Sequence, residues 1–347
     1  MIKKGLSYDD VLLAPQYSEI ESRADINIGI DMGHDLELSL PILASPMDTV
    51  SESSMAIAMQ KAGGAAVIHR YNTIEEQARQ ISIAKTMCSD KYGYRVNIGA
   101  AIGVSGDYLE RAQALRAQHV AFVCIDVAHG HHILMKKALH ELRKVVGENL
   151  HIMAGNIATL AGINDLSDWG ADSVRCNIGG GSICSTRVKT GHGIPGLQTI
   201  LDCAKTDRNV KIIADGGIRT SGDIVKALAA GADAVMCGSL LAGTDEAPGD
   251  VYQDLDGSRW KSYRGMASKE AQLKWRGRYN SQEGVATRIP YRGPIEDILR
   301  DIEAGVRSGF SYSGAIDMKS LHSRAQFMLQ TQSGLSESHT HIVGRKW

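Results

Sequence analysis

Eight short apolar runs, most of them followed by a segment with the apolar spacing of a helix, constrain the fold of this chain more than any other feature. Runs rich in Val, Ile and Ala that alternate with helices are typical of a parallel sheet covered by helices. The predicted strands are residues 41–47, 65–69, 96–102, 120–127, 151–156, 173–178, 211–215 and 234–238. Predicted helices include residues 53–62, 74–85, 108–117, 132–146, 222–230 and 295–308. Eight βα units in succession predict an α/β fold of the closed (β/α)8 TIM-barrel type.

An open, doubly wound sheet is the competing architecture. Such a sheet carries a glycine-rich dinucleotide loop after its first strand, whereas residues 45–49 of this chain read Ser-Pro-Met-Asp-Thr. The barrel is therefore favoured. A chain of 347 residues, of which 43% are hydrophobic, can bury the core of one such domain. We expect residues 1–347 to form a single catalytic barrel.

The charge balance and the N-terminal segment argue against several classes of protein. A formal net charge of −1 lacks the basic excess of a nucleic-acid or anionic-membrane binder. The first residues do not resemble a signal peptide, and no run reaches the ~18 consecutive apolar residues that span a bilayer. We therefore expect a soluble, cytoplasmic protein that binds a small molecule, with no nucleic acid and no membrane as partner.

Cysteines and histidines give little support for a metal site. The six cysteines are scattered without a CxxC pair, so neither a zinc knuckle nor a disulfide framework is expected, and most are interpreted as small buried residues. Histidines gather at residues 129–132 and 339–341, but no carboxylate or cysteine joins them at ligand spacing. A histidine-bound metal is not expected.

Glycine-containing segments end the seventh and eighth predicted strands, at residues 215–217 (Asp-Gly-Gly) and at Gly238 and Ser239. Bare backbone lets N–H groups approach an anion closely, and these two loops of a (β/α)8 barrel frequently hold a phosphate. With Ser182 in a third glycine-rich loop, they predict a site for a phosphate monoester. Asp215 at the same rim can accept hydrogen bonds from sugar hydroxyls; the alternative is an aspartate that caps a helix.

Cys184 lies in a loop that opens with three glycines after the sixth predicted strand. Backbone N–H groups of that loop and the nearby Arg187 favour an exposed thiolate, which makes Cys184 a candidate nucleophile. Thr186, two residues on, can place a hydroxyl beside the same reacting carbon. The alternative interpretation of Cys184 is an ordinary small residue in a turn.

A long segment, residues 241–292, interrupts the barrel pattern after the eighth strand. A connection of this length inside a compact domain is usually a lid or a binding loop, so we expect a mobile flap. Glu283, next to Gly284, is a candidate general acid or base that the flap carries over the site. A solvated glutamate in a hinge is the alternative.

Taken in order, these motifs resemble those of the IMP dehydrogenase and GMP reductase family. The matching segments are residues 8–13, 45–50, 125–130, 154–156, the loop around Cys184, 215–219 and 263–266. The resemblance implies that Cys184 adds to C2 of a purine nucleotide, and that the protein is a homotetramer.

The resemblance also implies which residues bind each ligand. The phosphate is expected at Ser182, Gly217, Gly238, Ser239 and Tyr263, the ribose at Asp215, and the base at Ser45, Met47 and Met266. Asp126 and Asn156 are expected to flank the nicotinamide of a dinucleotide. Backbone carbonyls are expected to line a monovalent-cation site, usually for potassium, at Gly179, Gly181 and Cys184.

The family has two branches that share the covalent adduct on the cysteine. One oxidises IMP with NAD and hydrolyses the adduct; the other releases ammonia from GMP and then reduces the adduct with NADPH to give IMP. Two features favour the reductase. Residues 85–94 form a connection too short for an inserted regulatory CBS pair, and Glu283 follows Tyr279 at the reductase spacing. In that branch, Thr186 and Glu283 serve the deamination.

Other features resemble the dehydrogenase branch. Arg278 and Tyr279 match its flap pair, and residues 55–58, 74–78 and 334–339 are closer to it. A dehydrogenase that lacks the CBS pair is therefore the alternative, and a barrel that senses purine nucleotides without catalysis is a third hypothesis. The cysteine loop departs from both branches, with Gly180 where proline is common and Ser185 where threonine is common.

Overall fold

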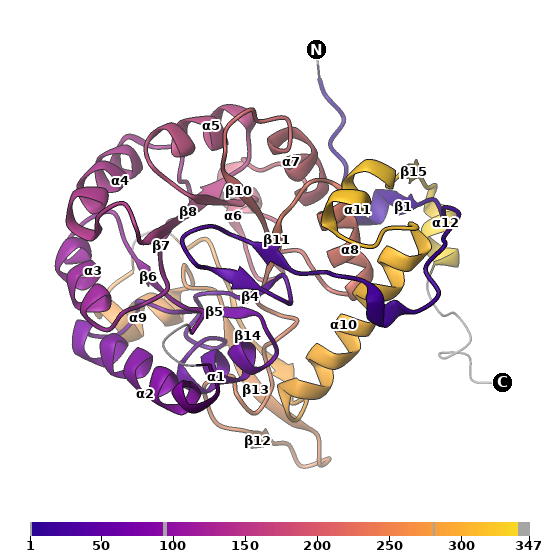
Figure 1. The fold of residues 1–347 in the computed structure, drawn as a ribbon. Helices are drawn as coiled ribbons and strands as arrows, with labels where there is room; N and C mark the ends of the chain where they lie inside the picture. The colour runs from indigo at the N-terminus through magenta and orange to yellow at the C-terminus, as the bar shows by residue number, and fades with distance from the viewer. Residues whose placement is uncertain (1, 93–95, 280–281, 339–347) are drawn as a thin grey trace.

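The computed structural model describes residues 2–92, 96–279 and 282–338, and these form a closed barrel of eight parallel strands ringed by helices (Figure 1). The barrel strands are β4 (Ile42–Ala44), β5 (Ala65–Ile68), β6 (Ile98–Ile102), β7 (Phe122–Asp126), β8 (His151–Ile157), β9 (Ser173–Cys176), β10 (Lys211–Asp215) and β11 (Ala234–Cys237). They follow chain order around the barrel, and β11 closes it by pairing in parallel with β4. The predicted (β/α)8 fold is confirmed.

Several strands end earlier than the apolar runs predicted. The first run was expected to continue to residue 47, but β4 ends at Ala44, and the sixth was expected to continue to residue 178, but β9 ends at Cys176. Residues such as Ser45 and Asn177, which were assigned to strands, begin the loops at the carboxyl end of the barrel instead. These loops form the site described below.

The helices of the ring largely match the predicted segments. The six that were predicted are α1 (Ser53–Lys61), α2 (Ile74–Tyr92), α3 (Tyr108–Ala117), α4 (Ile133–Val146), α8 (Ser221–Ala229) and α10 (Ile295–Tyr312). Further helices are α5 (Leu160–Asp168), α6 (Thr186–Thr190), α7 (Gly196–Cys203), α11 (Met318–Arg324) and α12 (Gln332–Glu337). In the described part of the chain, no helix has both the length and the apolar character needed to cross a bilayer.

The end of α2 corrects one expectation. Residues 85–94 were predicted to be a connection, but the helix continues to Tyr92, and residues 93 and 94 lie outside the described part. The helix continues because Ile81, Ala84 and Cys88 repeat at helical spacing and are all buried against the core.

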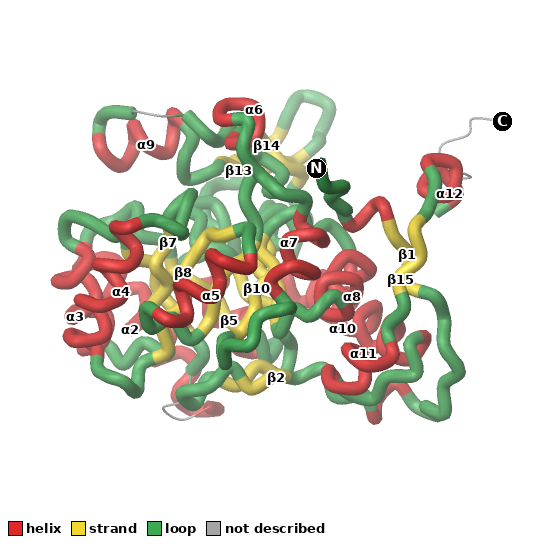
Figure 2. Tube along the Cα trace, turned by 90° about the horizontal axis from the view of Figure 1, so that it is seen from above, coloured by secondary structure: helices red, strands yellow, loops and turns green. Residues whose placement is uncertain are grey.

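The core fills both the barrel lumen and the layer between strands and helices. Alternate residues of a strand face opposite sides, so Leu43 belongs to the interior cluster while Ile42 packs outward. A short antiparallel hairpin, β2 (Ile30–Asp31) and β3 (Glu37–Leu38), adds Leu38 to the interior cluster. Figure 2 shows this hairpin at the opposite end of the barrel from α6.

The described residues of the segment 241–292 form a sheet and a helix outside the barrel. An antiparallel sheet is formed by β12 (Tyr252–Gln253), β13 (Arg259–Arg264) and β14 (Ala286–Pro290), and α9 (Lys269–Arg276) lies between the last two in sequence. Figure 2 shows α9, β13 and β14 beyond the carboxyl ends of the barrel strands, near α6. We call this segment the flap.

The chain termini pair beside the barrel. Strand β1 (Val11–Leu13) is antiparallel to β15 (Phe327–Leu329), and two 3-10 turns, η1 (Tyr8–Asp10) and η2 (Arg23–Asp25), flank the first of them in sequence. Figure 2 shows the β1–β15 ribbon and α12 standing off from the barrel wall.

His151, at the start of β8, makes the stability of the barrel depend on pH. Its side chain is fully buried, and its Nε2 lies 2.7 Å from the Ser173 hydroxyl. Burial lowers the pKa of His151 from 6.5 to about 4. The unfolded chain therefore takes up a proton at this residue below pH 6.5, while the folded protein does not until about pH 4.

As the pH falls from 6.5 to about 4, protonation of His151 in the unfolded chain should lower the free energy of unfolding by about 3 kcal/mol. The stability is present above pH 6.5 and is lost between pH 6.5 and about 4. Urea unfolding at a series of pH values measures it. His151→Gln, which does not titrate, should show a shallower dependence; the same slope in both proteins would contradict the assignment.

Candidate active site

A cavity of about 290 Å³ opens at the carboxyl ends of the barrel strands, next to the flap. Its volume is near the lower end of the range for small-molecule sites, about 300–1,000 Å³. All the residues that were assigned to catalysis or to binding of the nucleotide, the dinucleotide or the cation line this cavity. They are Ser45, Met47, Asp126, Asn156, Gly179, Gly181, Ser182, Cys184, Thr186, Asp215, Gly217, Gly238, Ser239, Tyr263, Met266 and Glu283. The structure brings these residues together, and their individual roles stay predictions.

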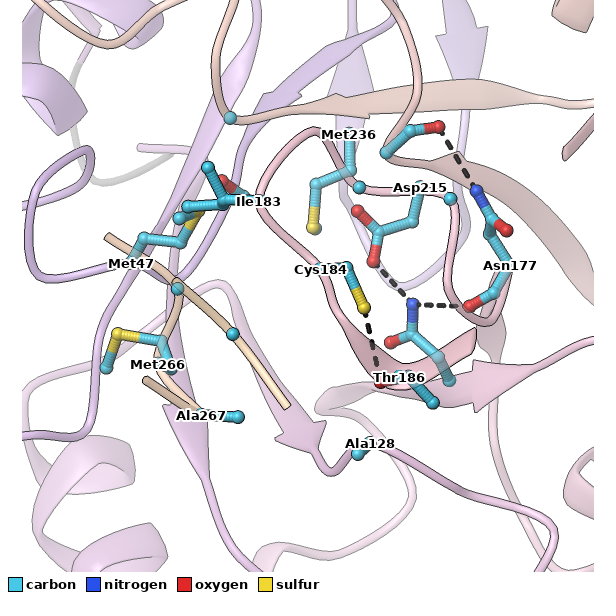
Figure 3. A pocket seen from close by; sticks show the side chains of 18 of the residues that line it. Met47, Ala128, Asn177, Ile183, Cys184, Thr186, Asp215, Met236, Met266 and Ala267 are labelled. Atoms are coloured by element: carbon cyan, nitrogen blue, oxygen red, sulfur yellow. Dashed lines mark hydrogen bonds between the residues drawn. The ribbon is translucent and has the colours of Figure 1, made fainter. Parts of the chain in front are cut away.

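Cys184, Thr186 and Glu283 form a hydrogen-bonded chain at the cavity wall. The Cys184 thiol donates to Thr186 Oγ1 at 3.2 Å, a contact drawn in Figure 3. The Thr186 hydroxyl donates in turn to Glu283 Oε2 at 2.8 Å. Cys184 is exposed, whereas the other five cysteines are buried, as expected of small core residues. The arrangement allows a proton to pass from the thiol through the hydroxyl to the carboxylate, which leaves a thiolate facing the cavity.

The flap is docked on the cysteine loop through backbone hydrogen bonds. The Ser185 N–H donates to the Glu283 carbonyl at 3.0 Å, and the Val285 N–H donates to the Ile183 carbonyl at 3.0 Å. The Glu283 N–H donates to the Ala267 carbonyl at 3.2 Å. These bonds place the Glu283 carboxylate at the end of the relay.

Arg187 has a different position from the one expected. Its guanidinium donates to the carbonyls of Ile178 and Ile194, at 3.4 and 2.7 Å. Its side chain also packs against Gly179, where a Cβ would lie 2.4 Å from Arg187 Cγ. Arg187 therefore packs against the glycine loop, and its charged guanidinium faces main-chain carbonyls.

Several of the predicted phosphate residues lie close to Tyr263 in the cavity. Burial raises the pKa of the Tyr263 phenol, against smaller opposing effects of the Ser182 and Ser239 side chains, so the phenol is neutral. Two of the predicted phosphate residues are glycines with little space for a side chain. A Cβ on Gly238 would lie 3.0 Å from Tyr263 Oη, and one on Gly217, whose φ is +76°, would lie 3.0 Å from a neighbouring carbonyl oxygen.

An apolar wall and a carboxylate stand on opposite sides of the sulfur. Figure 3 shows Met47, Ile183 and Met266 on one side of Cys184 and Asp215 on the other. A ligand with an apolar part and a hydroxylated part fits this division.

Contacts that the sequence reasoning missed hold the flap beside this wall. Asp48 forms an ion pair with Arg264 of β13, and its N–H donates to Met266 Sδ at 3.3 Å. The Tyr71 hydroxyl donates to the Met266 carbonyl at 2.8 Å, and its ring stacks on Trp275 of α9 with centroids 5.8 Å apart. In the sequence, Tyr71 could have been recognised as a site residue from its place just after the second predicted strand.

Arg175 is a buried cation beneath the cavity that the sequence reasoning also missed. It lies inside β9, and its guanidinium donates to Asp126 Oδ1 at 2.7 Å and to Asp215 Oδ2 at 2.8 Å. Burial by itself lowers the pKa of Arg175, but the neighbouring carboxylates raise it well above its usual value, so the side chain stays charged. In the sequence, Arg175 could have been recognised because it is a charged residue inside an otherwise apolar predicted strand.

Replacing Arg175 by methionine should lower the free energy of unfolding by about 3–5 kcal/mol, because two carboxylates lose their buried partner. Urea denaturation measures the change. The control is Arg79→Met, which breaks an exposed pair with Glu76 and should cost less than about 1 kcal/mol. Equal losses in the two variants would contradict the role assigned to Arg175.

The donors of the predicted cation site are main-chain oxygens. Carbonyl oxygens suit a hard cation, and the Gly181 carbonyl, which already accepts the Cys184 N–H at 3.1 Å, retains a second lone pair. Among the residues that the structure describes, no group of three His, Cys, Asp or Glu side chains is placed to hold a metal ion. His339 and His341 lie outside the described residues.

The fold and the cavity define a (β/α)8-barrel enzyme that presents an exposed cysteine at the carboxyl ends of its strands. The chain belongs to the IMP dehydrogenase and GMP reductase family, because the sequence model of the IMP dehydrogenase / GMP reductase domain matches residues 5–341. It is an oxidoreductase of this family, whose members bind IMP or GMP and a nicotinamide dinucleotide.

Relatives from both branches are similar to the chain. It is 36% identical to the inosine-5′-monophosphate dehydrogenase of Borreliella burgdorferi, with 98% of each protein covered. It is 32% identical to that of Nitrosopumilus maritimus, with 98% of this chain and 99% of the relative covered. Among solved structures, a cysteine-to-alanine variant of GMP reductase from Trypanosoma brucei, in complex with guanosine 5′-monophosphate, superposes with a TM-score of 0.91 at 30% identity, covering 98% of each chain.

Proposed function

We propose that the protein is a GMP reductase, which converts GMP and NADPH to IMP, ammonia and NADP through an adduct between Cys184 and C2 of the purine. The observation that carries the proposal is the relay from Cys184 through Thr186 to Glu283. It gives the cysteine a proton acceptor on the flap, and it gives the departing amine a proton donor.

The proposed reaction begins when Glu283 takes the thiol proton through the Thr186 hydroxyl. The Cys184 thiolate then forms a bond to C2 of GMP, and the relay returns a proton to the 2-amino nitrogen. The C2–N bond to the amino group breaks, ammonia leaves, and C2 stays bonded to the Cys184 sulfur as a thioimidate. The nicotinamide, when bound, supplies the hydride that C2 needs. The C–S bond then breaks, so that Cys184 is regenerated as a thiolate and IMP is released.

The rest of the cavity supports this assignment of ligand groups. We propose that Ser182, Ser239 and Tyr263, with the backbone of Gly217 and Gly238, hold the phosphate. Asp215 holds the ribose, and Ser45, Met47 and Met266 contact the base. In the same proposal, Asp126 and Asn156 flank the nicotinamide. The carbonyls of Gly179, Gly181 and Cys184 hold potassium in the same proposal.

For the overall organisation we propose one catalytic barrel domain without a CBS pair, assembled as a homotetramer. The course of α2 supports the first part, because the helix reaches Tyr92 and β6 begins at Ile98. The alignment with the Nitrosopumilus maritimus relative extends over 472 residues, against 347 in this chain, which also agrees with a segment that this chain lacks.

An IMP dehydrogenase is the second candidate, and the names of the two sequence relatives favour it. The flap side chains favour the reductase. Arg278 and Tyr279 are both exposed and are not among the described residues that line the cavity, while Glu283 lines it. The ring of Tyr279 lies 5.0 Å from the Lys269 ammonium instead.

The stoichiometry of ammonia tests the proposal. With GMP and NADPH, the purified protein should release one ammonia for each NADPH oxidised, and IMP should accumulate in the same amount. Oxidation of NADPH without release of ammonia would contradict the proposed adduct.

A further inference from the structure

The side chain of Asn177 lies between two loops that frame the cavity. Asn177 follows β9 and is 5% exposed. Its Nδ2 donates to the carbonyl of Gly216, in the loop after β10, at 3.2 Å (Figure 3). Its own carbonyl accepts Nδ2 of Asn156 at 3.1 Å, and Asn156 also donates to Asp215 at 2.7 Å. Asn177 therefore ties together the ends of β8, β9 and β10.

The same amide leaves no space for a side chain at Gly180. A Cβ on Gly180 would lie 2.2 Å from Nδ2 and 2.7 Å from Oδ1 of Asn177. The φ of Gly180 is not in the left-handed region, so the backbone conformation does not itself require glycine. A side chain at position 180 would therefore have to displace the Asn177 amide from its hydrogen bond to the Gly216 carbonyl.

The Asn177 amide is oriented by one partner only. The Gly216 carbonyl accepts hydrogen bonds and cannot donate, so the amide nitrogen must face it. The Oδ1 atom is buried without a hydrogen-bond partner among the described residues. A buried acceptor without a partner lowers stability, so net stabilisation does not account for an asparagine here.

We propose that Asn177 is a positioning residue, and that Asn177 and Gly180 form a coupled pair that sets the Cys184 loop against the Asp215 loop. The two loops touch through their backbones, since a Cβ on Gly216 would lie only 3.3 Å from the Cα of a glycine in the cysteine loop. The pair therefore determines where the sulfur meets a nucleotide whose ribose is held by Asp215. This inference rests on the proposed role of Cys184.

A double-mutant cycle tests the pair. Gly180→Ala should lower kcat about 100-fold, because the new methyl group must displace the amide and shift the cysteine loop. Asn177→Ala should lower kcat about 10-fold through loss of the bond to Gly216. In the double variant the methyl group has space, so its kcat should exceed that of Gly180→Ala about 10-fold. Gly222→Ala is the control, because a Cβ there meets nothing closer than 3.6 Å.

The rates are measured with the nucleotide and dinucleotide that the wild-type protein turns over, and the thermal midpoint is recorded for every variant. The same non-additivity is expected in the midpoint, which does not depend on the reaction catalysed; failure of the proposed reaction and failure of this inference are therefore distinguishable. If Gly180→Ala does not fold, recovery of a folded protein in the double variant supports the coupling. Additive effects, or a Gly180→Ala variant equal to the control, would overturn it.

Discussion

Replacing Cys184 by alanine should reduce turnover by on the order of 10⁴-fold or more, while the affinity for the nucleotide changes little. The reason is that the sulfur forms the bond to C2 in the proposed reaction, whereas the phosphate, ribose and base are assigned to other residues. Steady-state kinetics measures the first quantity, and equilibrium titration with GMP measures the second.

The matched control for this variant is Cys88→Ala. Cys88 is buried on α2 and is not among the described residues that line the cavity, so its loss should leave kcat within a few-fold of the wild type. A Cys184→Ala protein that retained a rate close to the wild-type rate would exclude covalent catalysis by this residue.

The second large effect is expected for Glu283→Gln, which keeps the size of the side chain but removes the carboxylate that accepts the proton in the relay. We expect kcat to fall by about 10² to 10⁴-fold, since this is the range that a positioned acid or base contributes. The KM for GMP should change much less, because Glu283 is assigned to proton transfer. Thr186→Val interrupts the same relay, so its kcat should fall by a similar factor to that of Glu283→Gln. Thr186→Ser keeps the hydroxyl and should retain most of the activity.

Glu270→Gln provides the control, since Glu270 is an exposed residue of the flap helix α9. It changes the charge of the flap by the same amount without touching the relay. Similar losses in Glu283→Gln and Glu270→Gln would mean that flap charge, rather than proton transfer through Thr186 to Glu283, controls the rate.

The sequence predicts the architecture well because the barrel depends on a repeated apolar pattern. Each of the eight strands is found, and residues 215–217, Gly238 and Cys184 meet in one cavity because all follow carboxyl ends of parallel strands. The carboxyl ends of strands such as β4 were placed too late, because apolar loop residues such as Met47 continue the pattern after the ladder has ended.

What the sequence pattern missed depends on pairings between distant segments. Arg175 interrupts an apolar strand, and only the fold shows that Asp126 and Asp215 surround it. Arg187 is near Cys184 in sequence, but two backbone carbonyls bind its guanidinium. The space that Asn177 takes from Gly180 could not be predicted either, because it depends on the packing of loops.

The fate of the adduct is the central question, and one comparison of absorbance answers it. The purified protein is given GMP with NADPH in one reaction and IMP with NAD in another, and the reduced nicotinamide is followed in both. We expect oxidation of NADPH with GMP at a rate well above the reaction with IMP and NAD. Formation of NADH from IMP, with no oxidation of NADPH by GMP, would contradict it.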